Sequence, residues 1–187
     1  MAYLNEEQLL AMGFKKLGKD VRISDKAAIY NPELMVLEDH VRIDDFCVIS
    51  GNVRFGRFVH VTPMCLVAGG IPGIVLEDFC TLAYGVKVFS QSDDYSGHTL
   101  VNSNIPKRFK NERFAAVHLH RQVIIGAGAV IMPGVDVAEG CAIGAMALVT
   151  RSTQAWGIYA GTPAVRLKER SRDLLSLEKQ FLEELEK

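Results

Sequence analysis

The sequence predicts an all-β solenoid, in which the chain coils into a column of short parallel strands. Large apolar residues recur at every sixth position without a slip, at Leu37, Ile43, Ile49, Phe55, Val61 and Val67. A second, smaller apolar residue follows each of them four positions later, at Val41, Cys47, Val53, Val59, Cys65 and Ile71. Because an α-helix repeats its face about every 3.6 residues and a strand every 2, neither explains a period of six. One flat side of a solenoid, a short strand with the corner that follows it, does explain it.

The period slips twice and stops once along the chain. It slips by three residues through Gly69–Gly73, where glycine and proline indicate a small bulging loop, and resumes at Leu76, Leu82 and Val88. It then stops for about thirty residues and restarts at Leu119, Ile125, Ile131, Val137, Ile143 and Val149. A second slip of three residues places its end at Ile158. Fifteen of these positions lie between Leu37 and Val149, so three sides per coil predict about five coils.

Two segments outside the repeat predict helices. Asn5 is a suitable N-cap, and the apolar residues Leu9, Leu10, Phe14 and Leu17 predict a short amphipathic helix that ends at Gly18. Arg170–Glu184 carries Leu174, Leu177, Phe181 and Leu182 on one face, which predicts a capping or oligomer-forming helix. We therefore divide the chain into an N-terminal helical segment (1–20), a solenoid domain (21–168) with an extended loop (89–117), and a C-terminal helix (169–187).

Composition excludes several classes of function. A net charge of −1 and a pI near 6.5 give no indication of binding to nucleic acid or to an anionic membrane. No apolar run approaches the roughly 20 residues that a membrane span needs, and Met1–Leu10 lacks the apolar core of a signal peptide. We expect a cytoplasmic protein without stable membrane insertion.

The four cysteines lack the spacing of a zinc site. Cys47, Cys65, Cys80 and Cys141 each follow a residue of the six-residue ladder by four positions, and no Cys-x-x-Cys pair exists. We expect them to be small buried thiols in the core.

Two sextets carry a resemblance to a known family. Ile125–Val130 and Ile143–Leu148 read Ile-Gly-Ala-Gly-Ala-Val and Ile-Gly-Ala-Met-Ala-Leu, and they resemble the repeats of the hexapeptide-repeat acyltransferases. The resemblance extends from Ile23 to Lys168. It implies a left-handed parallel β-helix, a homotrimer, and acyl-coenzyme A as the co-substrate. Gln91–Gly97 resembles a branch of this family that acylates amino sugars or sugar hydroxyls for surface polysaccharides.

The resemblance also implies where coenzyme A binds. Ala160–Ala164 is similar to the closing Gly-x-Pro-Ala motif, where the chain turns beside the nucleotide end of coenzyme A. Small residues let the pantetheine arm lie close to the backbone, and nearby cations can hold its phosphates. The implied coenzyme A residues are Ala127, Ala145, Thr150, Arg151, Gly161, Pro163, Arg166 and Lys168. Many relatives carry a basic residue directly after Pro-Ala, where this chain has Val165, so Arg166 is the expected substitute.

The interruption of the repeat is the predicted acceptor site, because long ordered loops are often functional. In the resembling trimers this loop reaches toward the next subunit. The candidate catalytic residues are Asp94, Asp93 and His98: a carboxylate can orient an ammonium group, whereas an imidazole is the usual base for a hydroxyl. The galactoside-acetyltransferase branch has a catalytic histidine where this chain has Asp93. That departure favours an amine as the acceptor.

The resulting hypothesis is the transfer of an acetyl or short acyl group from acyl-coenzyme A to an amino group of a nucleotide-linked 6-deoxy sugar. One alternative is O-acetylation of a sugar hydroxyl, for which His98 would matter more than Asp94. Another is a non-catalytic β-solenoid scaffold, which has no use for the polar loop.

Histidine-bound zinc is a further alternative, because some proteins of this solenoid shape are carbonic anhydrases. His118 and His120 alternate and are expected to point to one side of a strand. A third ligand would have to be His60 or His98. We therefore expect no metal.

Overall fold

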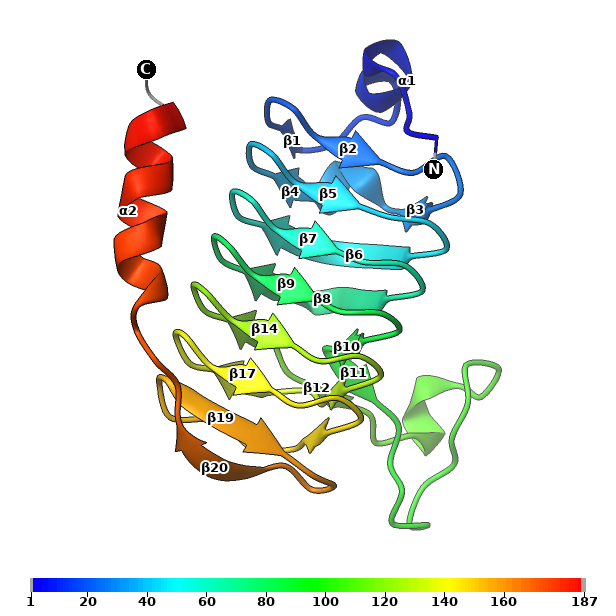
Figure 1. The fold of residues 1–187 in the computed structure, drawn as a ribbon. Helices are drawn as coiled ribbons and strands as arrows, with labels where there is room; N and C mark the ends of the chain where they lie inside the picture. The colour runs from blue at the N-terminus through cyan, green and yellow to red at the C-terminus, as the bar shows by residue number, and fades with distance from the viewer. Residues whose placement is uncertain (1, 186–187) are drawn as a thin grey trace.

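The chain folds into a parallel β-solenoid of about seven turns in a computed structural model that describes residues 2–185 (Figure 1). Each coil has three sides. Side one faces the viewer in Figure 1 and consists of β2 (Arg22–Ile23), β5 (Arg42–Ile43), β7 (His60–Val61), β9 (Thr81–Leu82), β14 (Ile124–Ile125), β17 (Ala142–Ile143) and β19 (Gly157–Ala160).

Sides two and three share two long strands that bend from one side to the other, β6 (Val48–Phe55) and β8 (Leu66–Leu76). Their first halves belong to side two, with β3 (Ala28–Tyr30), β10 (Lys87–Phe89), β15 (Val130–Ile131) and β18 (Leu148–Val149). Their second halves belong to side three, with β1 (Lys16–Leu17), β4 (Val36–Leu37), β13 (Val117–Leu119) and β16 (Asp136–Val137). Each corner is numbered by the side that follows it in the chain. Corner one precedes side one, corner two connects side one to side two, and corner three connects side two to side three.

The six-residue ladder forms the core, as the sequence predicts. Ile43 is in register with Val61, and Val61 with Leu82, so each ladder residue stacks on its equivalent in the next coil. These side chains are 0–1% exposed. The five coils expected between Leu37 and Val149 are all present, and a short 3₁₀ helix (Pro32–Leu34) precedes them. Since each coil is buried by its neighbours, stability is close to a sum of coil-to-coil contacts.

Two expected ladder positions are wrong. Ile71 is 85% exposed because Gly69–Gly73 bulges outward, and Ile74 takes the buried place two residues before Leu76. At the end of the repeat, Tyr159 rather than Ile158 is in register with Ile143 and points into the core. The slip after Val149 is therefore one residue longer than the sequence analysis places it.

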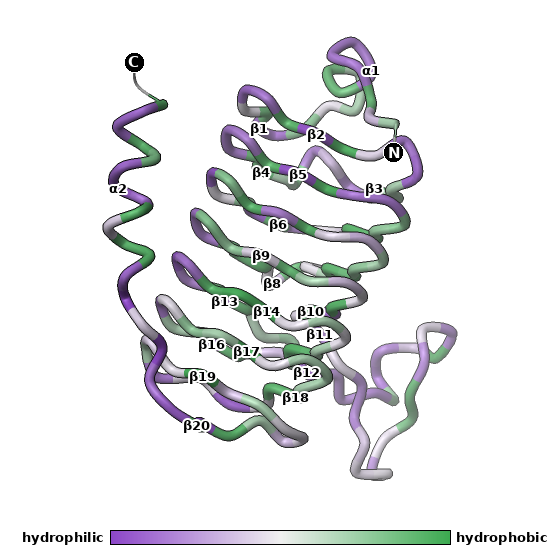
Figure 2. The backbone as a smooth tube through the Cα atoms, viewed as in Figure 1, coloured by the Kyte–Doolittle hydropathy of each residue, from purple (hydrophilic) through white to green (hydrophobic). Residues whose placement is uncertain are grey.

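All four cysteines are free and buried in the core, which confirms the expectation of small buried thiols. Burial raises the pKa of the Cys80 thiol to about 12, so it stays protonated at neutral pH. Figure 2 shows hydrophobic residues recurring along the strands, whereas several corners beside α2 are hydrophilic.

Residues at corner one adopt the left-handed conformation. His40, Phe58, Phe79 and Gln122 have φ between 59° and 63° and occupy equivalent places in successive coils. The rings of His40 and Phe58 stack with centroids 4.6 Å apart, and those of Phe58 and Phe79 at 5.0 Å. Such conformations cost about 1–2 kcal/mol for residues other than glycine, and ring stacking offsets part of that cost.

The N-terminal helix is shorter than the sequence predicts. α1 spans Glu6–Ala11, with a capping box in which the Asn5 side chain accepts from the Gln8 amide and the Gln8 side chain accepts from the Asn5 amide. Leu17 lies in β1 of the first coil and pairs with Leu37. Gly18 does not end the helix but turns a corner, where an added Cβ would lie 2.5 Å from the carbonyl carbon of Glu38.

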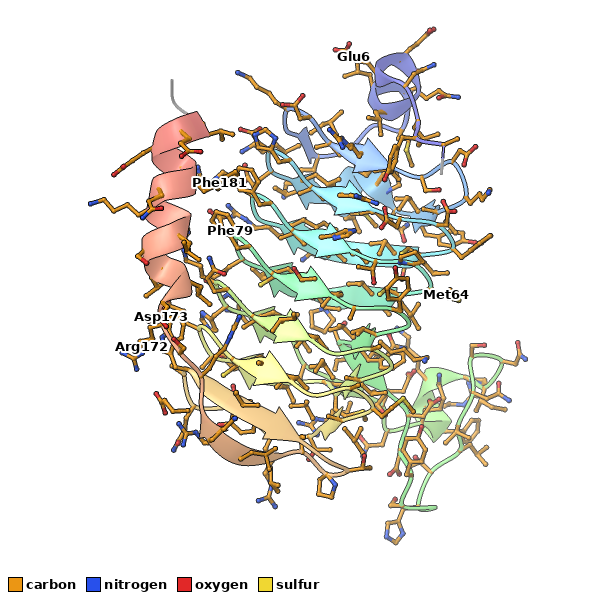
Figure 3. The ribbon with its side chains drawn as sticks, in the orientation of Figure 1. Glu6, Met64, Phe79, Arg172, Asp173 and Phe181 are labelled. Atoms are coloured by element: carbon orange, nitrogen blue, oxygen red, sulfur yellow. The ribbon has the colours of Figure 1, made fainter. Side chains whose placement is uncertain are left out.

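The chain after the last coil turns back along the solenoid. β20 (Val165–Glu169) pairs antiparallel with β19, and α2 (Leu174–Leu185) then runs alongside corner one (Figures 1 and 3). Figure 3 shows Phe181 of α2 pointing toward Phe79, and its ring lies 5.2 Å from that of Phe58. Because α2 lies beside the coils and not across the end of the solenoid, a capping role for it is wrong. No helix among the described residues is long and apolar enough to cross a membrane.

Gly140 and Gly85 form a matched pair for testing how corner one packs. Both have a φ of +68°, but an added Cβ at Gly140 would lie 2.5 Å from the Trp156 ring, whereas nothing lies within 4 Å of one at Gly85. We predict that Gly85→Ala lowers the free energy of unfolding by about 1–2 kcal/mol because of its φ. Gly140→Ala should cost about 1–3 kcal/mol more through overpacking. Urea unfolding measures both, and equal losses would contradict this packing.

Candidate functional site

The predicted loop leaves the solenoid at Ser90 and returns at Ala115, whose backbone amide donates to the Ser90 carbonyl at 2.9 Å. Ser90 is buried, and its hydroxyl also donates to the Ala68 carbonyl at 3.1 Å. The base of the loop is an antiparallel pair of β11 (Gln91–Ser92) and β12 (Arg113–Phe114), and a short 3₁₀ helix (Lys107–Phe109) lies within it. The loop therefore projects from a fixed point at corner three (Figure 1).

Two cavities flank the base of this loop. The first, of about 600 Å³, lies against side two and is lined by outward residues of successive coils, Ser50, Ala68, Phe89 and Met132, together with Tyr95 of the loop. The second, of about 510 Å³, lies against corner three and contains Lys107 and Lys110. Both volumes suit a small ligand. Gly70, Gln91 and Asp93 line both cavities, so these three residues lie where the cavities meet.

Asp94 holds the turn of the loop. Its carboxylate accepts hydrogen bonds from the Ser96 amide at 2.9 Å, the Ser96 hydroxyl at 2.8 Å and the Thr99 hydroxyl at 2.9 Å. These bonds, led by the one from the Ser96 amide, lower the pKa of Asp94. The carboxylate is therefore ionised and fixed in orientation at neutral pH.

His98 lies on the same turn but lines neither cavity. It is exposed, and its backbone amide donates to the Ser96 hydroxyl at 3.1 Å. Of the three candidate catalytic residues, the structure thus places Asp93 in the cavities, Asp94 next to it, and His98 outside them.

The eight residues implied to bind coenzyme A fall into three groups. Ala127, Ala145 and Gly161 stack in one exposed column at corner two, because Ile125 is in register with Ile143 and Ile143 with Tyr159. Pro163 follows in the turn between β19 and β20. The other members are exposed elsewhere: Thr150 and Arg151 at corner three, and Arg166 and Lys168 on β20.

The structure separates His60 from the pair His118 and His120. The rings of His118 and His120 stack 3.9 Å apart on side three, as their alternation predicts, and both contact Glu77. His60 lies on side one, where its Nε2 is 2.8 Å from Asp44. Burial opposes ionisation of Asp44, but hydrogen bonds from Arg42 and His60 hold its pKa below the ordinary value.

Comparison with known proteins decides the family. No family model matches the chain. The dTDP-4-amino-4,6-dideoxy-D-glucose acyltransferase of Escherichia coli is 36% identical over 97% of this chain and 95% of its own length. The chain belongs to the sugar acyltransferase family. A putative lipopolysaccharide O-acetyltransferase of the same species, WbbJ, is a more distant relative, 24% identical over 74% of this chain and 70% of its own length.

Solved structures of this acyltransferase family confirm the fold, including its left-handed parallel coil. AntD, an N-acyltransferase from Bacillus cereus, was solved with dTDP and 3-hydroxybutyryl-coenzyme A; it is 39% identical, with a TM-score of 0.97 over 99% of this chain and 98% of its own. A variant of AntD solved with dTDP-4-amino-4,6-dideoxyglucose and coenzyme A is 40% identical, with a TM-score of 0.97 over 98% of each chain.

Sequence reasoning missed the cavity walls of this acyltransferase. Ser50, Ala68, Phe89 and Met132 each directly follow a ladder residue, and the alternation of a strand points them outward on the same side. The position after each ladder residue was therefore a usable signal. Glu77 also directly follows a ladder residue, Leu76, but its separation of 41 residues from His118 hides their contact in the sequence.

We predict that Asp94→Ala loosens the loop turn, because it removes three hydrogen bonds that this carboxylate accepts. Exchange of the Ser96 amide hydrogen should accelerate at least tenfold, a change that NMR or mass spectrometry measures. Asp93→Ala is the control and should leave that exchange rate unchanged. Equal protection of Ser96 in wild type and Asp94→Ala would contradict the turn-holding role of Asp94.

Proposed function

We propose that this protein transfers an acetyl or other short acyl group from acyl-coenzyme A to the amino group of a nucleotide-linked 4-amino-4,6-dideoxy sugar. The observation that carries the proposal is Asp93, which lines both cavities and is followed directly by the ionised Asp94, whereas no histidine is among the residues that line them. The relatives support it, because the E. coli protein is named as a dTDP-4-amino-4,6-dideoxy-D-glucose acyltransferase and AntD as an N-acyltransferase, and they share 36–40% of their residues with this chain.

The acidic pair suits an amine acceptor. An amino sugar is an ammonium ion at neutral pH, and ionised carboxylates attract and orient it. Asp93 reaches it from the cavity wall, and the lowered pKa of Asp94 keeps a second negative charge beside it. A carboxylate of low pKa is a poor base, so Asp94 orients the ammonium group and does not remove its proton. O-acetylation needs a base such as an imidazole, and His98 lies outside the cavities.

The strip at corner two fits coenzyme A. Ala127, Ala145 and Gly161 present no bulky side chain along an exposed column, so an extended arm can lie against the backbone. Arg166 and Lys168 on the neighbouring β20 would hold the phosphates. When bound, acyl-coenzyme A supplies a thioester carbon. The ammonium group first loses one proton to water, and the neutral amine then forms the new C–N bond as the C–S bond breaks. The leaving thiolate takes up the second proton of the nitrogen.

The assembly and location follow from this chemistry as part of the proposal. Neither cavity is lined by a residue of the corner-two column, so we propose a homotrimer in which neighbouring solenoids bring the two substrates together. Exposed apolar residues at corner two, Phe46, Met64 and Met146, are 60–74% exposed and provide the surface for that contact. The reaction takes place in the cytoplasm, where acyl-coenzyme A is made, and serves surface polysaccharide biosynthesis.

We predict that Asp93→Asn and Asp94→Asn each lower kcat/KM for a dTDP-linked 4-amino-4,6-dideoxy sugar by at least a hundredfold, since each removes a charge that orients the amine. His98→Asn should retain at least half of the wild-type rate. Release of the coenzyme A thiol, followed with a thiol reagent, measures all three. Full rates in both aspartate variants would contradict the assignment of the site to this loop.

A further inference from the structure

A second cluster of chemically active side chains lies on side three, away from the loop cavities. Glu77 directly follows β8, and His118 and His120 stand in and after β13, the neighbouring strand. Because Leu76 is in register with Leu119, Glu77 and His120 occupy equivalent places in adjacent coils. Although the inserted loop separates Glu77 from His118 and His120 in the sequence, the three residues lie side by side in the structure.

The donor atoms within this cluster are close enough together to hold a metal ion. His118 Nε2 lies 2.7 Å and His120 Nδ1 3.3 Å from the same carboxylate oxygen of Glu77, and one donor atom from each residue lies within 4.8 Å of the others. Two ligands of a tetrahedral zinc ion, each at 2.0–2.1 Å from it, are about 3.3 Å apart. The three donors can therefore converge on one ion after small side-chain rotations.

The surroundings orient these ligands in the manner of known zinc sites. Asp136, in register with His118 on β16, lies 3.0 Å from His120 Nε2, the nitrogen on the far side of the ring. A carboxylate in that place fixes the tautomer of a metal-bound imidazole. The Arg121 amide donates to the second oxygen of Glu77 at 3.0 Å and fixes the carboxylate as well.

We propose that Glu77, His118 and His120 form a zinc site with one open position for water. Two imidazoles and one carboxylate are a donor set that zinc accepts. The ion would join the coil that precedes the inserted loop to the coil that follows it. Its role is to fix that junction and not to take part in acyl transfer, whose proposed residues lie in the loop, at corner two and on β20.

Zinc binding to the purified, metal-free protein tests the site. Calorimetry should give one zinc per chain, and cobalt should give the visible absorption bands of tetrahedral coordination. His118→Ala and His120→Ala should each weaken zinc binding at least a hundredfold. Asp136→Asn should weaken it about 10–100-fold, because it removes the partner of a ligand and not a ligand. Zinc should raise the Tm of wild type and not that of the double variant His118→Ala/His120→Ala.

His60→Ala is the matched control, since His60 also contacts a carboxylate but lies on side one. It should bind zinc as wild type does. The proposal is overturned if wild type binds no stoichiometric zinc at millimolar concentration. It is equally overturned if zinc binds the double variant as tightly as wild type, which would show adventitious surface binding. Because the readouts are binding and Tm, they are independent of whether the acyl acceptor is correct.

Discussion

Stacking of each coil on the next is the interaction on which the rest of the structure depends. A ladder residue such as Val61 is buried only because Ile43 lies on one side of it and Leu82 on the other. No coil has a core of its own, so the period of six must hold wherever the chain continues the column. Departures from it are confined to corner three, where the outward bulge at Gly69–Gly73 and the loop after Ser90 leave the ladder intact.

The same constraint positions the functional groups. β10 pairs with β15 and β8 with β13 across the insertion, so the loop is carried by a continuous sheet on both sides. Outward residues of side two therefore form a fixed wall of the cavity that Asp93 also lines. The column of small residues at corner two is fixed in the same way, by the register of β14, β17 and β19. A rigid scaffold with one long loop is a common way to build a site for a polar ligand.

The sequence predicted the parts of this structure that periodicity controls. The ladder, the five coils and the position of the loop follow from apolar spacing alone. The left-handed conformation at the corners could not be predicted, because residues such as His40 and Phe58 carry no glycine or asparagine signal. The contact of Glu77 with two histidines was also not predicted, because these residues become neighbours only when β8 and β13 pair across the inserted loop. In the loop, the sequence predicted Asp93 and Asp94 as candidate catalytic residues. It did not predict that Asp93 lines the cavities whereas Asp94 holds the turn.

A crystal structure with coenzyme A and a dTDP-linked 4-amino-4,6-dideoxy sugar tests the central claim most directly. The account predicts the sugar amine within about 3 Å of a carboxylate oxygen of Asp93 or Asp94. It also predicts the pantetheine arm along Ala127 and Ala145, with its sulfur next to that amine. A sugar bound away from the loop cavities, or an amine that contacts neither carboxylate, would contradict it.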